Sequence, residues 1–178
     1  MSEVQNVNGI YAGIFILRIA VGIVMIAHGR NHIWGGGKIE GTAGWFASLG
    51  MKPGILHAWL ASITELVCGG MLILGFLQPF AAAGVIGVML VALITNHLKN
   101  GFFIFRPGEG YEYVLTLLLT GFALAGIGAG KWSIDWHIDS TWLYGWKGLL
   151  IAAVFGVGGA ATLLAVYWKP EPKADSLS

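Results

Sequence analysis

The feature that most constrains this chain is a long run of apolar residues with one full charge inside it. Residues 57–76 read HAWLASITELVCGGMLILGF, and Glu65 is the only acidic residue among them, with no Lys or Arg. A helix of this length extends about 30 Å, which is the thickness of the hydrocarbon core of a bilayer. Because a carboxylate at that depth is costly in contact with lipid, we expect Glu65 to face a partner or a polar cavity.

Arg18 is the candidate partner, because it is the only other full charge that lies so deep inside an apolar run, residues 10–27. At the rise of an α-helix, Arg18 lies about 15 Å from His28, and Glu65 lies about 12 Å from His57. Antiparallel packing of the two helices would bring both charges to one depth. We therefore predict a buried ion pair between Arg18 and Glu65 near the middle of the membrane.

Composition extends this conclusion to the whole chain. Of its 178 residues 56% are hydrophobic and 11% are charged, and a mean hydropathy of +0.74 is too apolar for a soluble domain of this length. We predict one all-α domain over residues 1–168, a polytopic membrane bundle, followed by a polar tail at 169–178. The membrane spans are predicted at about residues 10–28, 55–77, 80–98, 111–130 and 145–168.

The charge distribution bears on partners and on orientation. The net charge is +1 and the sequence contains no basic stripe, so we expect no nucleic-acid partner. One side of the predicted bundle carries most of the Lys and Arg residues, namely Arg30, Lys38, Lys52, Lys99, Arg106, Lys169 and Lys173. Only Lys131 and Lys147 fall on the other side. The positive-inside rule then places the connections 29–53 and 99–110 and the C-terminus in the cytoplasm, and the N-terminus outside.

Polar and aromatic side chains gather at one end of the predicted bundle. An up-and-down order of the helices places the ends that carry His28, His57, His97 and Glu112 at the same membrane face. The residues Tyr111, Tyr113, Asn96, Asn100 and His32 lie beside them in the sequence. Such residues are also common as simple anchors near lipid headgroups, and Arg18 and Glu65 are also compatible with a purely structural pair.

Two kinds of ligand could use this cluster. His28 and His32 have the HxxxH spacing of a metal site, but Gly29 and the glycines at 35–37 favour an end of the helix near them. We therefore predict no metal. A polar pocket that opens onto an apolar interior instead suits a quinone, whose carbonyls accept hydrogen bonds while its tail stays in lipid.

The quinone interpretation assigns a role to each polar residue of the cluster. Histidine and glutamate could exchange the protons that accompany quinone reduction. The predicted catalytic residues are His28, His97, Glu112 and Tyr111. The predicted cofactor-binding residues are Asn100, Tyr113 and His57.

Several segments of the sequence match a known family, in order LR at 17–18 and then AHGRNHIWG, GTAGWFASLGMKPG, LASITELVCGGMLILGF, NHLKNGFF and YEYVLTLLL. In these segments the sequence resembles the DoxX family of small bacterial and archaeal membrane proteins. The resemblance implies a four-helix core, to which the run at 145–168 adds a fifth, C-terminal transmembrane helix. It also implies an inner-membrane protein that resembles the small membrane subunit of a thiosulfate:quinone oxidoreductase.

Two classes of function follow from these expectations. The first is an integral membrane subunit of a quinone-linked oxidoreductase complex, working with other subunits or as an oligomer. The alternative is an accessory or assembly subunit of a larger membrane complex with no chemistry of its own. A small transporter is less favoured, because no inverted repeat or broken helix is visible. The sequence leaves the enzymatic activity open.

Overall fold

The computed structural model describes residues 2–170, and within that range the chain forms helices joined by turns and loops. The helices are α1 (Ser2–Trp34), α2 (Lys38–Ser48), α3 (Gly54–Leu74), α4 (Gln78–Ala92), α5 (Glu112–Ile127), α6 (Ile134–His137), α7 (Trp146–Ile151) and α8 (Gly158–Tyr167). A π-helical segment, Leu93–His97, and a 3-10 turn, Leu98–Asn100, extend α4. A second π-helical segment, Ala152–Val157, joins α7 to α8.

Four continuous helical stretches are long and apolar enough to cross a bilayer, namely Val7–Trp34, Gly54–Leu74, Gln78–Asn100 and Trp146–Tyr167. The predicted span 111–130 corresponds to α5, which is apolar but shorter. The prediction of an all-α, polytopic membrane bundle is confirmed. The largest difference concerns α1, which continues to Trp34 where the sequence suggested an end at His28. Of the predicted polar tail, only Lys169 and Pro170 lie among the described residues.

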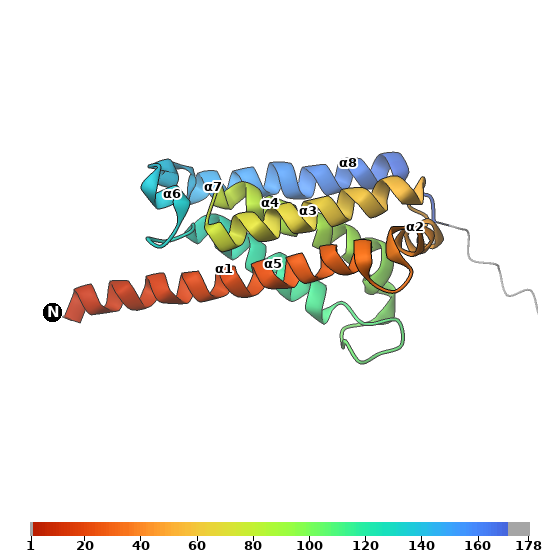
Figure 1. Ribbon diagram of the computed structural model, residues 1–178, viewed down its shortest axis with the longest axis horizontal. Helices are drawn as coiled ribbons and strands as arrows, with labels where there is room; N and C mark the ends of the chain where they lie inside the picture. Colours follow the sequence, from red (N-terminus) through yellow and green to blue (C-terminus); the bar gives the residue numbers. More distant parts are fainter. Residues whose placement is uncertain (1, 171–178) are drawn as a thin grey trace, which may run out of the picture.

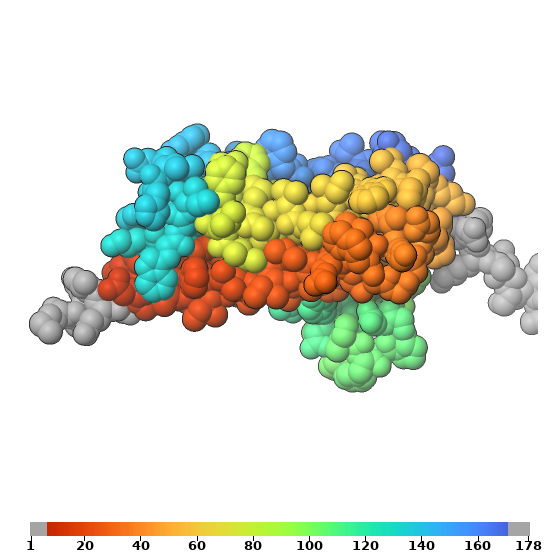
Figure 2. Space-filling view, in the orientation of Figure 1, coloured from red at the N-terminus to blue at the C-terminus, as the bar shows by residue number. Residues whose placement is uncertain are grey.

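The long helices run alternately in opposite directions through one bundle (Figure 1). The N-terminal end of α1 lies at one end of the bundle, and the end of α8 lies at the other. In the middle stands α4, which packs against α3, α5 and the segment from α7 to α8, while α1 packs along α3. The space-filling view shows the loop that precedes α5 projecting from the side of this bundle (Figure 2).

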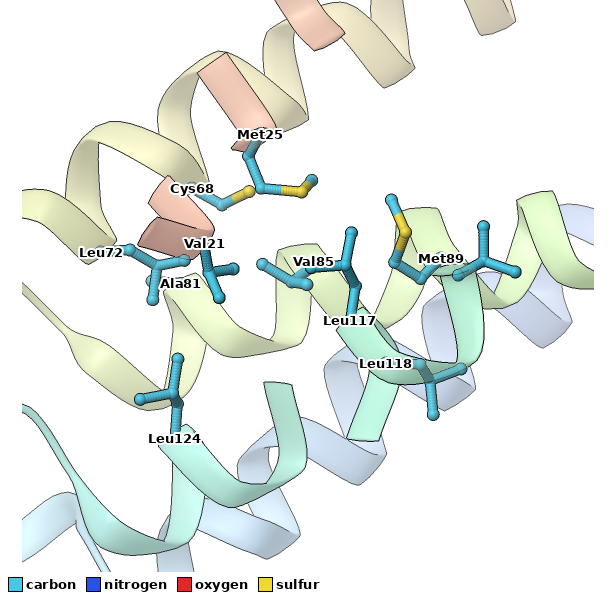
Figure 3. Packing of buried hydrophobic residues seen from close by; sticks show 11 residues of the cluster. Val21, Met25, Cys68, Leu72, Ala81, Val85, Met89, Leu117, Leu118 and Leu124 are labelled. Atoms are coloured by element: carbon cyan, nitrogen blue, oxygen red, sulfur yellow. The ribbon is translucent and has the colours of Figure 1, made fainter. Parts of the chain in front are cut away.

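The apolar core fills the space between α1, α3, α4 and α5 (Figure 3). Its buried side chains are Val21, Met25, Cys68, Leu72, Ala81, Val85, Met89, Val114, Leu117, Leu118 and Leu124. Cys68 packs inside this cluster, as expected of a small apolar residue. Because lipid offers no hydrophobic drive for helix association, such close packing is the main force that holds the helices together.

Glycines set the register between α1 and α3. A Cβ atom added at Gly22 would lie 2.7 Å from the carbonyl oxygen of Gly69, and one added at Gly69 would lie 2.7 Å from that of Gly22. Gly29 approaches the carbonyl oxygen of Ser62 in the same way, at 2.8 Å. Small residues allow two backbones to come this close. The register therefore tolerates no sliding of one helix along the other.

Arg18 does not form the predicted ion pair with Glu65. Its guanidinium donates hydrogen bonds through Nη1 to the carbonyl oxygens of Leu72 (2.7 Å) and Ile73 (3.1 Å), and through Nη2 to that of Trp132 (2.6 Å). The last turn of a helix leaves its carbonyl groups without partners, and a cation there also complements the helix dipole. Arg18 therefore stabilises the C-terminal end of α3.

Glu65 lies at a different level of the bundle, where its Oε2 atom is 3.0 Å from Nδ1 of His32. Since Arg18 contacts Ile73, the register separates its level from that of Glu65 by eight residues of α3, or about 12 Å. The predicted ion pair is wrong because it placed His28 and His57 at one level, whereas α1 runs on to Trp34.

A second buried charge holds the turn between α3 and α4 from the other side. The carboxylate of Asp135 accepts hydrogen bonds from the backbone N–H groups of Leu77 (2.7 Å) and Gln78 (2.9 Å), which begin α4. It also accepts bonds from the hydroxyl groups of Ser140 (2.8 Å) and Tyr144 (2.9 Å). We call Arg18 and Asp135 the turn clamp, because one stabilises the end of α3 and the other stabilises the start of α4.

Candidate functional site

A cavity of about 600 Å³ runs along α4, and its polar part lies towards the end of the bundle opposite the turn clamp. It is bounded by the end of α1, by α2, by the first half of α3, by α4 with its π-helical extension, by the start of α5 and by α8. Its main titratable lining residues are His28, His32, His57, His97, Glu65 and Tyr113. Four of the five histidines of the chain therefore line one cavity.

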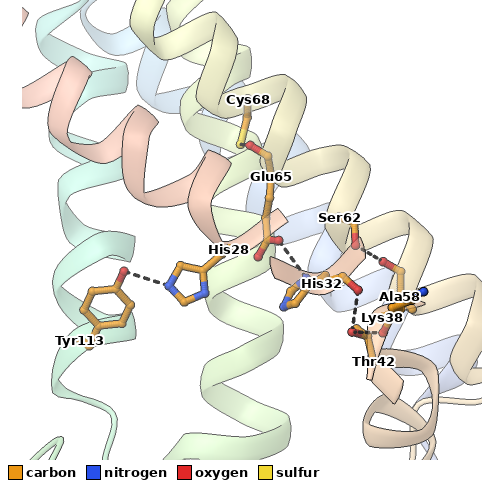
Figure 4. Close-up of polar contacts among 9 residues, drawn as sticks. All are labelled: His28, His32, Lys38, Thr42, Ala58, Ser62, Glu65, Cys68 and Tyr113. Atoms are coloured by element: carbon orange, nitrogen blue, oxygen red, sulfur yellow. Dashed lines mark hydrogen bonds and ion pairs between the residues drawn. The ribbon is translucent and has the colours of Figure 1, made fainter. Parts of the chain in front are cut away.

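The central polar contact of the site joins His32 of α1 to Glu65 of α3 (Figure 4). Glu65 is 3% exposed, and its Oε2 atom lies 3.0 Å from Nδ1 of His32. The hydroxyl of Thr42 donates to the carbonyl oxygen of His32 at 2.9 Å, so α2 holds the end of α1 in place. The site thus contains a buried carboxylate whose observed partner is a histidine.

Two further histidines of the cavity, His28 and His97, contact α5 and the loop before it. Nε2 of His28 lies 3.3 Å from the hydroxyl oxygen of Tyr113, which joins α1 to α5 (Figure 4). Nδ1 of His97 lies 3.0 Å from the carbonyl oxygen of Glu109, where the π-helical end of α4 meets the following loop. Nε2 of His97 also lies 3.4 Å from Nδ2 of Asn96, so both rings are positioned by polar contacts.

His57 at the start of α3 has a different environment. Its ring lies edge-on to that of Tyr167 at 5.1 Å between centroids. The side chain is buried, and within residues 2–170 its Nε2 atom has no hydrogen-bond partner. Buried polar atoms are nearly always paired, so an unpaired one that lines a cavity points to a ligand or a bound water.

Three of the predicted site residues do not line the cavity. Oε2 of Glu112 accepts a hydrogen bond from the N–H of Ile104 at 3.3 Å. Nδ2 of Asn100 donates to the carbonyl oxygen of Gly108 at 2.6 Å, and the ring of Tyr111 packs edge-on to Phe102. Contrary to the prediction, these side chains stabilise the loop 101–110. The first turn of α5 directs Tyr113 to the cavity and its two preceding residues to the loop.

Sequence reasoning missed the role of His32 and assigned the wrong partner to Glu65. The HxxxH spacing from His28 contained the signal, but Gly29 suggested that the helix ended between the two histidines. In the structure Gly29 lies inside α1 because it packs against Ser62. His28 and His32 then turn to different partners, and among the described residues no group of three or more His, Cys, Asp or Glu is arranged to hold a metal ion.

Comparison with known proteins agrees with the sequence motifs. Residues 13–98 match the model of the DoxX family. The uncharacterized membrane protein Rv3486 of Mycobacterium tuberculosis is 26% identical over 130 residues, which cover 68% of this chain and 78% of that protein. No solved structure matches the chain. The matched region contains Glu65 and all four histidines of the cavity. The family resemblance predicted from the motifs is confirmed: residues 13–98 of this multi-pass membrane protein are similar to the DoxX family.

Proposed function

We propose that this chain binds a quinone in the cavity and acts as an integral membrane subunit of a quinone-linked oxidoreductase complex. The observation that carries the proposal is the division of one cavity into two parts. Its polar part carries the histidines and Glu65, and its remaining wall consists of apolar residues from α3, α4 and α8. A volume of about 600 Å³ is within the usual range of small-molecule sites, about 300–1,000 Å³.

The polar part has the donors that a quinone head group requires. A neutral imidazole offers one N–H donor and one acceptor, and the tyrosine hydroxyl offers another donor. His57 is the strongest candidate for a direct bond, because its buried Nε2 atom has no partner within residues 2–170. The residues that would hold the head group are His57, His97, His28 and Tyr113, all of which line the cavity.

The contact between His32 and Glu65 provides a route for protons. A bound quinone would supply a redox group that takes up two electrons and two protons. His32 lines the cavity and also an open hollow of about 340 Å³, which includes Lys38 and Thr42. It therefore stands between that hollow and Glu65. In this proposal His32 passes protons inward, and Glu65 holds a proton beside the cavity.

We further propose that the cavity end of the bundle faces the cytoplasm, because most basic residues lie at that end. Cysteines introduced at Lys38 and Arg106 in a Cys68→Ser background should be protected from an impermeant thiol reagent in intact cells. A cysteine at Lys147, at the opposite end, should be labelled. Labelling of the first two positions and protection of the third would reverse the orientation.

The direct test of the proposed function is quinone binding by the full chain in lipid nanodiscs. A ubiquinone or menaquinone analogue, titrated while protein fluorescence is followed, should bind saturably to the wild type. His57→Ala and His97→Ala should weaken this binding, whereas His137→Ala, at the other end of the molecule, should not. A folded wild type that binds neither class of quinone would favour the accessory or assembly subunit instead.

A further inference from the structure

We infer that the apolar part of the cavity is a channel for a long hydrocarbon tail, which enters sideways from the bilayer between α3 and α8. This inference rests on the proposed function, since the channel would hold the tail of the same quinone whose head group the histidines bind. It narrows the ligand class to quinones with a membrane-embedded chain. It also gives a role to α8, which lies outside the region matched by the family model.

The channel follows α4 over most of its length. Both Asn96, beside the histidines, and Phe80, near the turn clamp, line the cavity. They are sixteen residues apart on one continuous helix, or about 24 Å. Small residues form the floor and one wall, namely Ala83, Gly84 and Gly87 of α4, Gly156 of the π-helical segment before α8, and Gly159 and Ala160 of α8. The opposite wall comes from α3 through Leu60, Ala61 and Thr64.

Both ends of the channel are closed by contacts between these walls. At the polar end the ring of His57 meets that of Tyr167, and Lys52 donates its backbone N–H to the carbonyl oxygen of Tyr167 at 3.3 Å. At the far end the rings of Phe80 and Phe155 lie 5.4 Å apart between centroids. A ligand that arrives along the bundle axis would meet one of these two closures.

The side of the channel is open. Leu60 of α3 and Gly159 of α8 both line the cavity, and both are exposed on the surface of the bundle. That surface consists of apolar membrane-spanning helices, so what it meets is lipid. A molecule dissolved in the bilayer can therefore enter the cavity between α3 and α8. Its polar group would then lie at the histidines, and its hydrocarbon chain would lie along α4.

The glycines of the channel differ in what surrounds them. A Cβ atom added at Gly84 would lie 2.8 Å from Cβ of Cys68, and one added at Gly156 would lie 2.9 Å from the carbonyl oxygen of Ala83. Those two glycines serve helix packing. A Cβ atom added at Gly159 would meet no atom within 4 Å. A larger side chain at Gly159 can therefore occupy the channel without displacing a helix.

The experiment compares two quinones with the same head group in nanodiscs. One is the tail-free 2,3-dimethoxy-5-methyl-1,4-benzoquinone, and the other carries a ten-carbon chain. Each dissociation constant is expressed in terms of the quinone concentration in the bilayer. The different partitioning of the two quinones between water and lipid then does not affect the comparison. Gly159→Leu should weaken binding of the tailed quinone about tenfold and leave the tail-free quinone unchanged. The matched control is Gly158→Leu, because Gly158 is exposed but does not line the cavity.

The outcomes separate the channel from the head-group site. Equal affinity of the wild type for both quinones, or unchanged binding of the tailed quinone by a folded Gly159→Leu variant, overturns the channel and leaves the head-group site standing. An equal loss in Gly158→Leu also overturns it. A phospholipid that stays in the cavity and is not displaced by the tailed quinone assigns the channel to a lipid chain instead. Absence of binding for both quinones refutes the proposed function as well.

Discussion

The two ends of the bundle both contain buried charges, and they use them differently. At the turn clamp, Asp135 accepts four hydrogen bonds, and Arg18 donates three to backbone carbonyls. Nε of Arg18 and the side-chain amide of Gln78 have no partner within residues 2–170, but neither residue lines the cavity. At the cavity, the observed partner of the Glu65 carboxylate is His32, and His57 keeps an unpaired buried nitrogen within residues 2–170. A buried charge whose bonds are provided by the fold stabilises that fold. A buried polar group with unused bonds beside a cavity is available to a ligand.

The largest effect is expected at Asp135. Asp135→Ala would remove one carboxylate and leave two backbone N–H groups and two hydroxyl groups without their acceptor. We expect a loss of about 3–5 kcal/mol in the free energy of unfolding, seen as a low yield of folded protein or early thermal unfolding in detergent. The control is Asp139→Asn, because Asp139 is exposed. A wild-type melting temperature in Asp135→Ala would show that the clamp is not a stabilising element.

Arg18→Gln should follow, with a loss of about 2–3 kcal/mol, because the carbonyl groups at the end of α3 lose a charged donor. Combination with Glu65→Gln tests whether the two charges are independent. Sites about 12 Å apart without a shared partner have additive effects, so the double variant should lose the sum of the two single losses. Recovery of stability in the double variant would mean that Arg18 and Glu65 interact directly after all, as the sequence suggested.

The contacts of Arg18 in the turn clamp could not be predicted from the sequence. Apolar length alone predicted most of the helix bounds within a few residues, since a span must cover a fixed thickness of hydrocarbon. The partner of Arg18 depends on the register of α1 against α3, and that register is set by contacts such as Gly22 on Gly69. Hydrophobic periodicity does not encode it. The sequence therefore indicated that Arg18 and Glu65 are buried, but not what each of them contacts.

The residues at the cavity end of the bundle were also predictable in part, from the order of the helices. Helix order alone brought His28, His57 and His97 to one end of the bundle, and all three line the cavity. Side-chain direction at a helix end depends on the first turn and on the adjoining loop, so Glu112 was misplaced. Asp135 was missed because it lies in a short segment with several tryptophans, which is typical of a membrane surface and gives no sign of the contact with the start of α4.

Glu65→Gln should cost far less stability than Asp135→Ala, although both carboxylates are buried. Glutamine keeps the size and polarity of the side chain, and the contact of Glu65 with His32 is a close approach without a hydrogen bond of good geometry. We therefore expect a loss of no more than about 1 kcal/mol. Quinone binding in nanodiscs should nevertheless weaken, because the carboxylate no longer orients the histidine beside the cavity. A large loss of stability with unchanged binding would place Glu65 in the same class as the turn clamp.

A further expected effect concerns the response of the clamp to pH. Burial, together with the Asp135 carboxylate at 2.9 Å, raises the pKa of Tyr144 above its ordinary value near 10. The folded state therefore favours the neutral phenol, which donates its proton to Asp135. Its contribution to stability is complete below about pH 10 and is lost as the pH rises from there towards the raised pKa.

Two substitutions separate this titration from the hydrogen bonds that surround it. Tyr144→Phe should lower the free energy of unfolding by about 1.5 kcal/mol at neutral pH and should make its decline above pH 10 shallower than in the wild type. Ser140→Ala removes another donor to Asp135 that does not titrate in this range. It should lower stability at neutral pH and keep the wild-type slope. Identical slopes in Tyr144→Phe and the wild type would mean that Asp135 does not hold Tyr144 in its neutral form, and that the pH response of the clamp end comes from other groups.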